Sequence, residues 1–457
     1  MRSTVIHLKK FRKKGNRLDP RFYLGEKRVK NITNGNYDGF IKLGDLLDYF
    51  ADGSRLTSCE AGIPMLRLSN LHACDIHFSG LKYASIDKAA KWTAVKPQDV
   101  LFTQAAEPFR AAVMPQGFDD ITVSSEITVM RPKPAVVPEY LAAILSAPTM
   151  GMILKDLAYR RSATASRRLQ LKDIAGIPIP LPGRELQNKI KKAYDEAARL
   201  SQESETELSQ IIQAVHAEID RKTEIDRKTQ MPATPHRFKI RKTDLSGRWD
   251  VAYCANEVLR KQLLESGSVT HLLQIAKAVP STLKGIDEDE HVCAVKAEHI
   301  NENTMMVESV ETCRLSDLSP RMRQPLNPGD VLICTTGNGE QVAYLDEKTA
   351  AEGCRILGSA TFTALRFTET PRYFTIAMTH PIVRAQLNSL STGAVQRFVS
   401  KKDLDSLLVT KLSVIWREDF DSRVARAFER RREALTAKAH VLEFAEQFLR
   451  EELGVRS

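Results

Sequence analysis

The sequence contains no long apolar run and few cysteines. Nowhere do about 18 apolar residues follow one another, and the basic N-terminal stretch MRSTVIHLKKFRKKGNRLDP lacks the apolar centre of an export signal. The seven cysteines are odd in number and include no CxxC pair, so neither a disulfide framework nor a zinc ribbon is expected. These absences predict a cytoplasmic protein with reduced thiols and no membrane partner.

Motifs typical of catalysis are also missing. The sequence has no Walker A motif, no Gly-x-Ser-x-Gly and no Asn/Asp-Pro-Pro-aromatic motif of amino-methyltransferases. The stretch TTGNGE lacks the third glycine of a nucleotide-binding loop and is interpreted as a turn. His72, Cys74 and His77 of HACDIH are expected on one strand, where alternating side chains cannot converge on a metal. The chain is therefore predicted to be no enzyme and to bind no cofactor or metal.

The charge of the chain is positive and unevenly distributed. The 457 residues, 42% of them hydrophobic, suffice for two or three domains, and the formal net charge is +10. Residues 1–40 hold eleven Lys or Arg against three Asp or Glu. Such a basic arm fits a polyanion, and a solvated tail is the alternative.

The chain consists of two loosely similar halves. Six segments of the first half return in the same order, 229 to 234 residues later. The pairs are RLDPRFYLGE (from Arg17) with RWDVAYCANE (Arg248), IKLGDLL (Ile41) with THLLQIA (Thr270), VKPQDVLFTQ (Val95) with LNPGDVLICT (Leu326), SSEITVMRP (Ser124) with GSATFTALR (Gly358), YLAAILSAP (Tyr140) with YFTIAMTHP (Tyr373), and LQLKDIAGI (Leu169) with VSKKDLDSL (Val399). A fixed order at a nearly fixed offset indicates duplication.

Each half is predicted to be an α+β domain followed by a long helix. Short apolar runs such as DVLFTQ and DVLICTT, bounded by Gly, Pro and Asp, predict strands, and PEYLAAILSAPTMGMILKDL has helical spacing. The expected parts are a basic arm at 1–16, a first domain at 17–182, a first helix at 183–230, a linker at 231–247, a second domain at 248–416 and a second helix at 417–457.

Both long helices carry a stripe of residues alternately four and three positions apart. The first stripe comprises Ile190, Tyr194, Ala197, Ser201, Ser204, Leu208, Ile211 and Val215, and the second Val424, Phe428, Arg431, Leu435, Lys438, Leu442, Ala445 and Leu449. Two such seams, each interrupted by polar residues, favour an antiparallel coiled coil within one chain. Ordinary amphipathic helices, each lying on its own domain, are the alternative.

These features resemble the specificity subunits of type I restriction-modification systems, a family that serves phage defence. The resemblance covers nearly the whole chain and rests on the Arg-x-Asp-x-x-aromatic opening of each half, on KPQDVLF and NPGDVLI, and on LKDIAGIPIPLPGRELQNKI before the first helix. It implies a non-catalytic DNA reader with two target-recognition domains, each reading half of a split target, and helices that fix the gap. It also implies two methyltransferase subunits, which bind S-adenosylmethionine, and a restriction subunit where the system includes one.

Sequence-specific reading requires forked donors on loops, among groups that grip phosphate. The corresponding loops YRRSATASRRLQ and LSTGAVQRFVSKK are both basic, although a solvated face is the alternative for each. The candidate DNA contacts of the first half are Ser54, Arg55, Gln104, Arg110, Arg160, Arg161, Arg167, Arg168 and Gln170. Those of the second half are Thr282, Lys284, Thr336, Asn338, Thr392, Gln396, Arg397, Lys401 and Lys402.

The hexapeptide EIDRKT occurs twice in succession, at 218–223 and 224–229. In a helix each copy adds about 9 Å, the length of two to three base pairs, so the repeat is a candidate ruler between half-sites. A slipped duplication at a helix end is the alternative.

For the whole chain, the alternative function is a coiled-coil scaffold that organises a defence or repair complex without reading sequence. A metal-dependent nuclease, using carboxylates of YLDEK or DEDE, is a further one.

Overall fold

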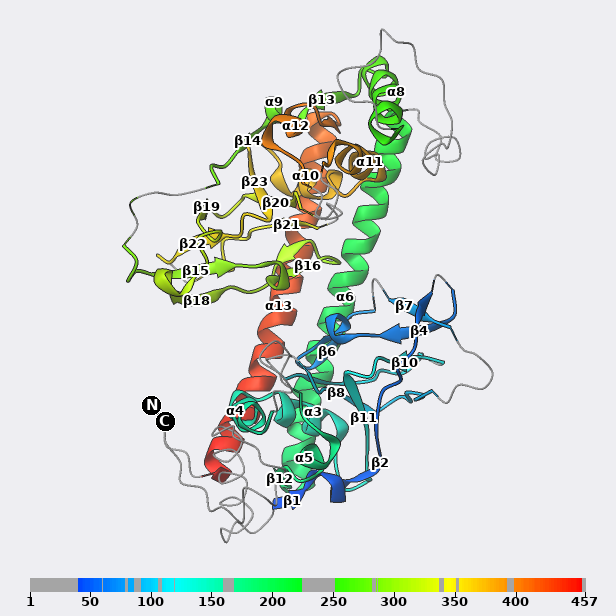
Figure 1. Ribbon diagram of the computed structural model, residues 1–457, viewed down its shortest axis with the longest axis vertical. Coiled ribbons are helices and arrows are strands. Elements are labelled where there is room, and N and C mark those ends of the chain that lie inside the picture. The colour runs from blue at the N-terminus through cyan, green and yellow to red at the C-terminus, as the bar shows by residue number, and fades with distance from the viewer. Residues whose placement is uncertain are drawn as a thin grey trace. The chain divides into compact units, whose positions relative to one another are not determined.

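The computed structural model divides into two compact units (Figure 1). Unit 1 is formed by Met1–Leu200 and Ala434–Ser457, and unit 2 by Ser201–Glu433. The structure describes residues 40–59, 61–78, 81–85, 92–105, 109–118, 120–158, 168–223, 251–281, 285, 287–336, 341–350, 353–392 and 398–453. Within these ranges, no helix combines the length and the apolarity that a membrane span requires.

Unit 1 combines two four-stranded sheets with short helices, as expected for an α+β domain. The strand orders are β2-β11-β8-β9 and β10-β4-β7-β3. Helix α3 packs on β8 and β9, where Tyr140 and Ile144 join Phe102 in a buried core. The elements are β1 (Phe40–Lys42), η1 (Leu43–Leu46), β2 (Leu47–Asp52), β3 (Ser58–Cys59), β4 (Ile63–Leu66), η2 (Leu68–Asn70), β5 (Leu71–His72), β6 (Asp75–Ile76), β7 (Lys82–Ala84), β8 (Val100–Thr103), β9 (Ala111–Val113), β10 (Thr122–Val123), β11 (Ile127–Pro132), α3 (Pro138–Ser146), α4 (Pro148–Leu157), α5 (Leu171–Ala175) and β12 (Pro178–Pro180).

Unit 2 has a six-stranded sheet, β14-β23-β20-β21-β17-β16, and a four-stranded sheet, β18-β15-β22-β19. Helix α10 packs on the larger sheet, and its Tyr373 and Phe374 are buried with Val331 and Leu365. The elements are α8 (Val251–Glu265), β13 (Val269–His271), α9 (Leu272–Ile275), β14 (Ala276–Ala278), β15 (His291–Val295), η4 (Ala297–His299), β16 (Ile300–Asn301), β17 (Met306–Val307), β18 (Glu311–Arg314), η5 (Leu315–Asp317), β19 (Gln324–Leu326), β20 (Val331–Cys334), β21 (Val342–Tyr344), β22 (Arg355–Gly358), β23 (Phe362–Phe367), α10 (Pro371–Ala377), α11 (Pro381–Leu390), α12 (Lys401–Asp405) and β24 (Leu408–Thr410).

The two units repeat one chain path, which confirms the duplication. In unit 1, β1 leads through a helical turn into β2, and β12 returns to pair with β1 in antiparallel fashion. In unit 2, β13 leads through α9 into β14, and β24 returns to pair with β13. Strand β8 lies between β11 and β9, as β20 lies between β23 and β21. Proline begins α3 and α10, because the first helical position needs no N–H donor.

An ion pair between a buried aspartate and a partly exposed arginine recurs at the same place in each unit. Arg131 donates from Nε and Nη2 to Asp99 at 2.8 Å each, and Arg366 donates to Asp330 at 2.8 and 3.0 Å. Both aspartates are fully buried. The sequence comparison set Pro132 opposite Arg366, whereas the shared ion pair makes Arg131 its counterpart, so the alignment shifts by one residue here.

The two long helices, α6 (Arg184–Thr223) and α13 (Val414–Leu453), contribute to the core of each unit. In unit 1, Ile190, Tyr194 and Ala197 of α6 share a core with Val441, Ala445, Phe448 and Leu449 of α13. In unit 2, Leu208, Ile211, Val215 and Ile219 of α6 share a core with Phe420, Val424, Ala427 and Phe428 of α13. The start of α6 thus lies with the end of α13, and the end of α6 with the start of α13. The helices pair in antiparallel fashion, as predicted.

The buried stripe of each long helix follows the sequence pattern with one difference. All eight expected positions of α6 are buried, from Ile190 to Val215. In α13, Leu435 and Leu442 are only half-buried, and the stripe passes instead through the fully buried Ala434 and Val441. The buried residues Phe428, Arg431 and Ala434 are each three positions apart, where a heptad pattern alternates spacings of three and four. This extra spacing of three moves the following buried positions one residue toward the N-terminus.

A fully buried arginine occupies the polar position of the α13 stripe in unit 2. Arg431 donates from Nε and Nη2 to the Glu308 carboxylate at 2.7 and 3.2 Å. Its Nη1 donates to the Ser201 hydroxyl at 2.6 Å and to Glu205 at 3.2 Å. Because a buried charge is costly unless it is paired and hydrogen-bonded, these partners explain why an arginine is tolerated in the seam.

The structure corrects the expectation of reduced thiols for two cysteines. Cys293 on β15 and Cys354, the residue before β22, form a disulfide in unit 2 across 61 residues of sequence. Strands β15 and β22 pair in parallel, with Val292 opposite Arg355. This pairing brings the side chains of Cys293 and Cys354, the neighbours of these two residues, close together. Sequence reasoning missed the pair because two cysteines so far apart carry no spacing signal.

Candidate nucleic-acid interface

Three of the candidate DNA contacts in the first half meet at one turn, Ser124–Glu126, between β10 and β11. Ser54 forms a parallel bridge with Ser124, and the Gln104 backbone N–H donates to the Glu126 carbonyl at 2.9 Å. Arg168 donates from Nη2 to the Ser125 carbonyl at 2.8 Å. Residues that the sequence separates widely therefore hold a single surface turn.

Gln104 lies at the centre of this arrangement and is buried. Its side-chain oxygen accepts from Nε and Nη2 of Arg168 at 3.1 and 3.0 Å. Its side-chain amide donates to the Thr128 hydroxyl at 2.6 Å and to the Asp52 carboxylate. Because these groups satisfy one another, Gln104 and Arg168 position the neighbouring loop instead of presenting free forks to bases.

The second half builds its loop base from backbone contacts. Thr336 and Thr392 each form an antiparallel bridge with Phe398. Thr392 and Phe398 exchange backbone hydrogen bonds of 2.9 and 2.8 Å. The phenyl ring of Phe398 is 45% exposed beside this bridge.

The two loop bases are structurally equivalent. Leu169 N–H donates to the Gln104 carbonyl at 3.0 Å, and Val399 N–H donates to the Thr335 carbonyl at 2.9 Å. Directly before these residues stand Arg168 and Phe398, each bridged to the strand end of its own unit. The duplicated fold thus places the end of each basic loop at the same position in each half.

The remaining candidates lie in varied surroundings. Arg55 is exposed, Gln170 is the half-buried N-cap residue of α5, and Arg110 donates to the Leu71 carbonyl at 3.3 Å. Lys401 and Lys402 begin α12, the helix that follows the second loop. The candidates Arg160, Arg161, Arg167, Thr282, Lys284, Asn338, Gln396 and Arg397 lie outside the described residues.

Sequence reasoning overlooked Phe398 and the backbone of Ser125. Phe398 follows directly after Arg397 in the basic loop, and its place opposite Arg168 in the half-to-half comparison was available as a signal. In double-stranded DNA, an exposed apolar ring can contact the methyl group of thymine in the major groove. The role of Ser125 was not detectable, because a carbonyl acceptor is shared by every residue type.

The HACDIH segment forms a hairpin and not the single strand that the alternation suggested. Strands β5 and β6 pair in antiparallel fashion, and Cys74 between them has a φ of 58°. Burial raises the pKa of the Cys74 thiol to about 12, which keeps it protonated and a poor metal ligand. Asp75 accepts hydrogen bonds from Lys438 and His77, both in unit 1. The hairpin therefore supplies the partly buried partner of Lys438 in the α13 stripe.

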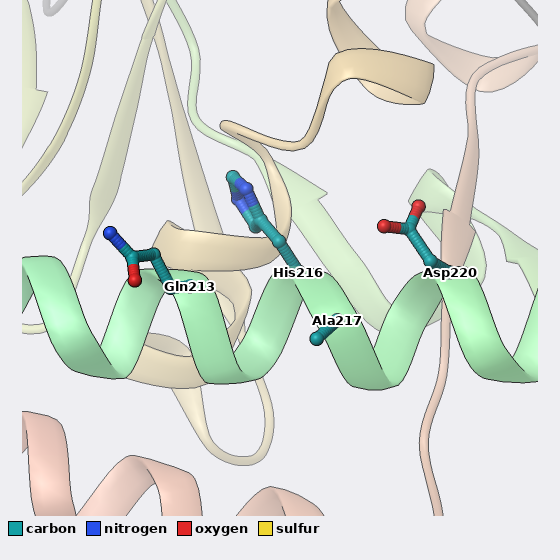
Figure 2. Close-up of a pocket in the computed structure, with 4 residues that line it drawn as sticks. All are labelled: Gln213, His216, Ala217 and Asp220. Carbon is teal, nitrogen blue, oxygen red and sulfur yellow. The ribbon is translucent and has the colours of Figure 1, made fainter. Parts of the chain in front are cut away.

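A shallow hollow lies on α6 in unit 2, lined by Gln213, His216, Ala217 and Asp220 (Figure 2). His216 Nε2 lies 3.1 Å from the Thr379 hydroxyl, and His380 Nε2 lies 3.2 Å from Asp220. Because the Ile382 N–H donates to Nδ1 of His380, the Nε2 of that ring carries the hydrogen and donates to Asp220. His216 and Asp220 thus hold the turn between α10 and α11.

Comparison with solved structures finds chains that align over most of this one. The HsdS subunit from Thermoanaerobacter tengcongensis is 13% identical and matches 92% of this chain and 99% of its own, with a TM-score of 0.30. A chain from a structure of the type I R-M system is 12% identical and matches 91% and 98%, with a TM-score of 0.29. The type I restriction-modification S subunit from M. genitalium is 11% identical and matches 91% and 95%, with a TM-score of 0.37.

No protein-family model matches the sequence, and no curated protein matches it.

Proposed function

We propose that this chain is the non-catalytic specificity subunit of a type I restriction-modification complex, or of a related phage-defence methylation complex, in the cytoplasm. Each α+β unit reads one half of a bipartite double-stranded DNA target. Two methyltransferase subunits, which supply the S-adenosylmethionine site, bind alongside, and a restriction subunit joins where the system includes one. The chain itself contributes base contacts and spacing, without a cofactor or metal.

The observation that carries this proposal is the equivalent placement of the ends of the two basic loops. Each loop ends at a backbone hydrogen bond to the residue that follows β8 or β20, at Leu169 in one half and at Val399 in the other. The buried aspartate of each unit directly precedes the same strand. Two copies of one reader on a single chain match a target with two half-sites. The loops differ in sequence, as they must if each half reads different bases.

Partner binding has a candidate surface at the start of α13. Val414, Ile415 and Trp416 are 53%, 80% and 43% exposed, which is unusual for three consecutive large apolar residues. The first long helix begins with the exposed Arg184 and Glu185 at the corresponding place. We propose that one methyltransferase subunit covers the apolar surface at the start of α13. The other methyltransferase subunit would contact the polar surface at the start of α6.

A scaffold that organises a complex without reading sequence is the competing function. The test maps methylated bases in the genome of cells with and without the gene for this chain, expressed with its methyltransferase partners. Specific reading predicts a bipartite motif that is methylated only when the chain is present. An unchanged methylation pattern, with the complex assembled, would favour the scaffold. Binding of the purified complex to DNA with and without the motif gives the independent check.

A further inference from the structure

The EIDRKT duplication is a feature that the proposed function leaves unexplained. Residues 218–223 and 224–229 are identical, and the structure describes the first copy, as the last turns of α6. The second copy lies outside the described residues. Because the copies are identical, deleting either one yields the same chain, in which EIDRKT occupies 218–223.

The first copy is built into the core of unit 2. Ile219 is buried with Leu208, Ile211 and Val215 on the stripe of α6. Thr223 is also buried, and its hydroxyl donates to the Ile219 carbonyl at 2.9 Å. Glu218 pairs with Arg221, three positions further along the helix, at 2.5 Å.

Two contacts join the first copy to elements of the second reader. Asp220, which lines the hollow of Figure 2, accepts from the buried His380, the N-cap residue of α11. The Ser268 hydroxyl, just before β13, donates to the Lys222 carbonyl at 2.9 Å. A chain with one copy keeps Asp220 and Lys222, and therefore keeps both contacts.

We infer that the second copy does not set the distance between the two half-sites. The position of unit 2 on α6 is fixed by contacts from Leu208 to Thr223, and these contacts involve the same residues whatever the number of copies. Additional copies lengthen only the connection between Thr223 and α8. The inference rests on the proposed function, because a gap between half-sites is defined only for a bipartite target.

The inference opposes the ruler hypothesis, and the two predict different numbers. A ruler adds about 9 Å per copy along the helix, so the gap changes by two to three base pairs. It also rotates the second reader, since six residues turn a helix by roughly 600°. A longer connection after Thr223 changes neither the gap between the half-sites nor the rotation of the second reader.

The experiment compares four complexes: the natural chain, a deletion of 224–229, a chain with a third EIDRKT copy after residue 229, and a chain with 224–229 replaced by GSGSGS. The methylated sequence is mapped for each. We expect the same two half-sites and the same gap from all four. A gap that changes with copy number, or loss of methylation in the deletion, would overturn the inference.

A second measurement is independent of DNA reading. Hydrogen exchange of the peptide covering residues 208–223 should show the same protection in the complexes with one, two and three copies, because its partners are unchanged. Lower protection in the one-copy chain would mean that the second copy supports the anchor, and would overturn the inference. Six residues inserted after Leu200 serve as the positive control, since they precede the anchored stretch and should abolish methylation or change the gap.

Discussion

Arg431 of α13 and Glu308, one residue after β17, form a two-pronged ion pair inside unit 2, with N–O distances of 2.7 and 3.2 Å. Glu308 also accepts from Asn301 and Thr304 at 2.9 Å each, which fixes its carboxylate against the sheet. The pair therefore connects the second long helix to the domain that precedes it in sequence.

Replacing Arg431 by Met should destabilise unit 2 strongly. The variant removes a buried positive charge and leaves Glu308 without its partner, a change that typically costs about 3 to 5 kcal/mol. Denaturant unfolding of the assembled complex measures the effect. The neighbouring Arg430 is the matched control, because it pairs with Glu207 at the surface and its replacement by Ala should cost under about 1 kcal/mol. Equal losses for the two variants would contradict this assignment.

Replacing Arg168 by Ala should impair recognition of the first half-site only. The variant leaves the buried Gln104 oxygen without its two donors and frees the Ser125 turn, at a cost of about 1 to 3 kcal/mol. Binding is compared on DNA with either half-site scrambled. Affinity for the intact target should fall while the contribution of the second half-site persists. An equal loss on random DNA would reduce the loop to phosphate contact.

The exposed Arg55 supplies the control for that experiment, because it lies next to Ser54 and its side chain is accessible. Arg55→Ala removes a donor without disturbing the Gln104 contacts. Its thermal unfolding should match that of the natural chain, whereas Arg168→Ala lowers the melting temperature.

Replacing Ile415 by Asp should weaken the binding of one methyltransferase subunit. A charge in the centre of the apolar surface cannot be desolvated cheaply when a partner covers it. Native mass spectrometry of the co-expressed complex should show a shift from two methyltransferase subunits to one. Met152→Asp is the matched control, since Met152 is 53% exposed but lies in unit 1. Retention of both subunits by the Ile415 variant would exclude this surface.

Reduction of the Cys293–Cys354 bond should destabilise the second reader. A cross-link over 61 residues restricts the unfolded chain, and removal of such a bond typically costs about 2 to 4 kcal/mol. Chemical unfolding with and without dithiothreitol measures this, with Cys354→Ser as the variant. Because a reducing compartment keeps most thiols reduced, mass spectrometry of protein alkylated during cell lysis shows which form is present in cells. An unfolding curve insensitive to dithiothreitol would contradict a stabilising role.

The fold was largely predictable because duplication supplies an internal comparison. Segments such as KPQDVLF and NPGDVLI are weak strand signals singly, but their shared order fixed the path of both halves. The polar residues of the two stripes were placed correctly in the seams, yet their partners were not foreseen. Glu308 and Asp75 lie far from Arg431 and Lys438 in sequence, and periodicity carries no information on such contacts.

The site was less predictable, because residue type alone does not separate a reader from a support. Gln104 and Arg168 have forked donors suited to bases, and the structure engages those donors within the protein. Phe398 has no such donors and remains exposed. Which side chain is free depends on turns such as Ser124–Glu126, which form only when distant strands meet.

The most direct test of the two-reader organisation exchanges residues 17–180 for those of a related subunit and maps the methylated sequence. Because each unit anchors the end of its own basic loop at its own sheet, we expect one half-site to change and the other to persist, with the same gap. A change in both half-sites would contradict independent readers on a duplicated chain.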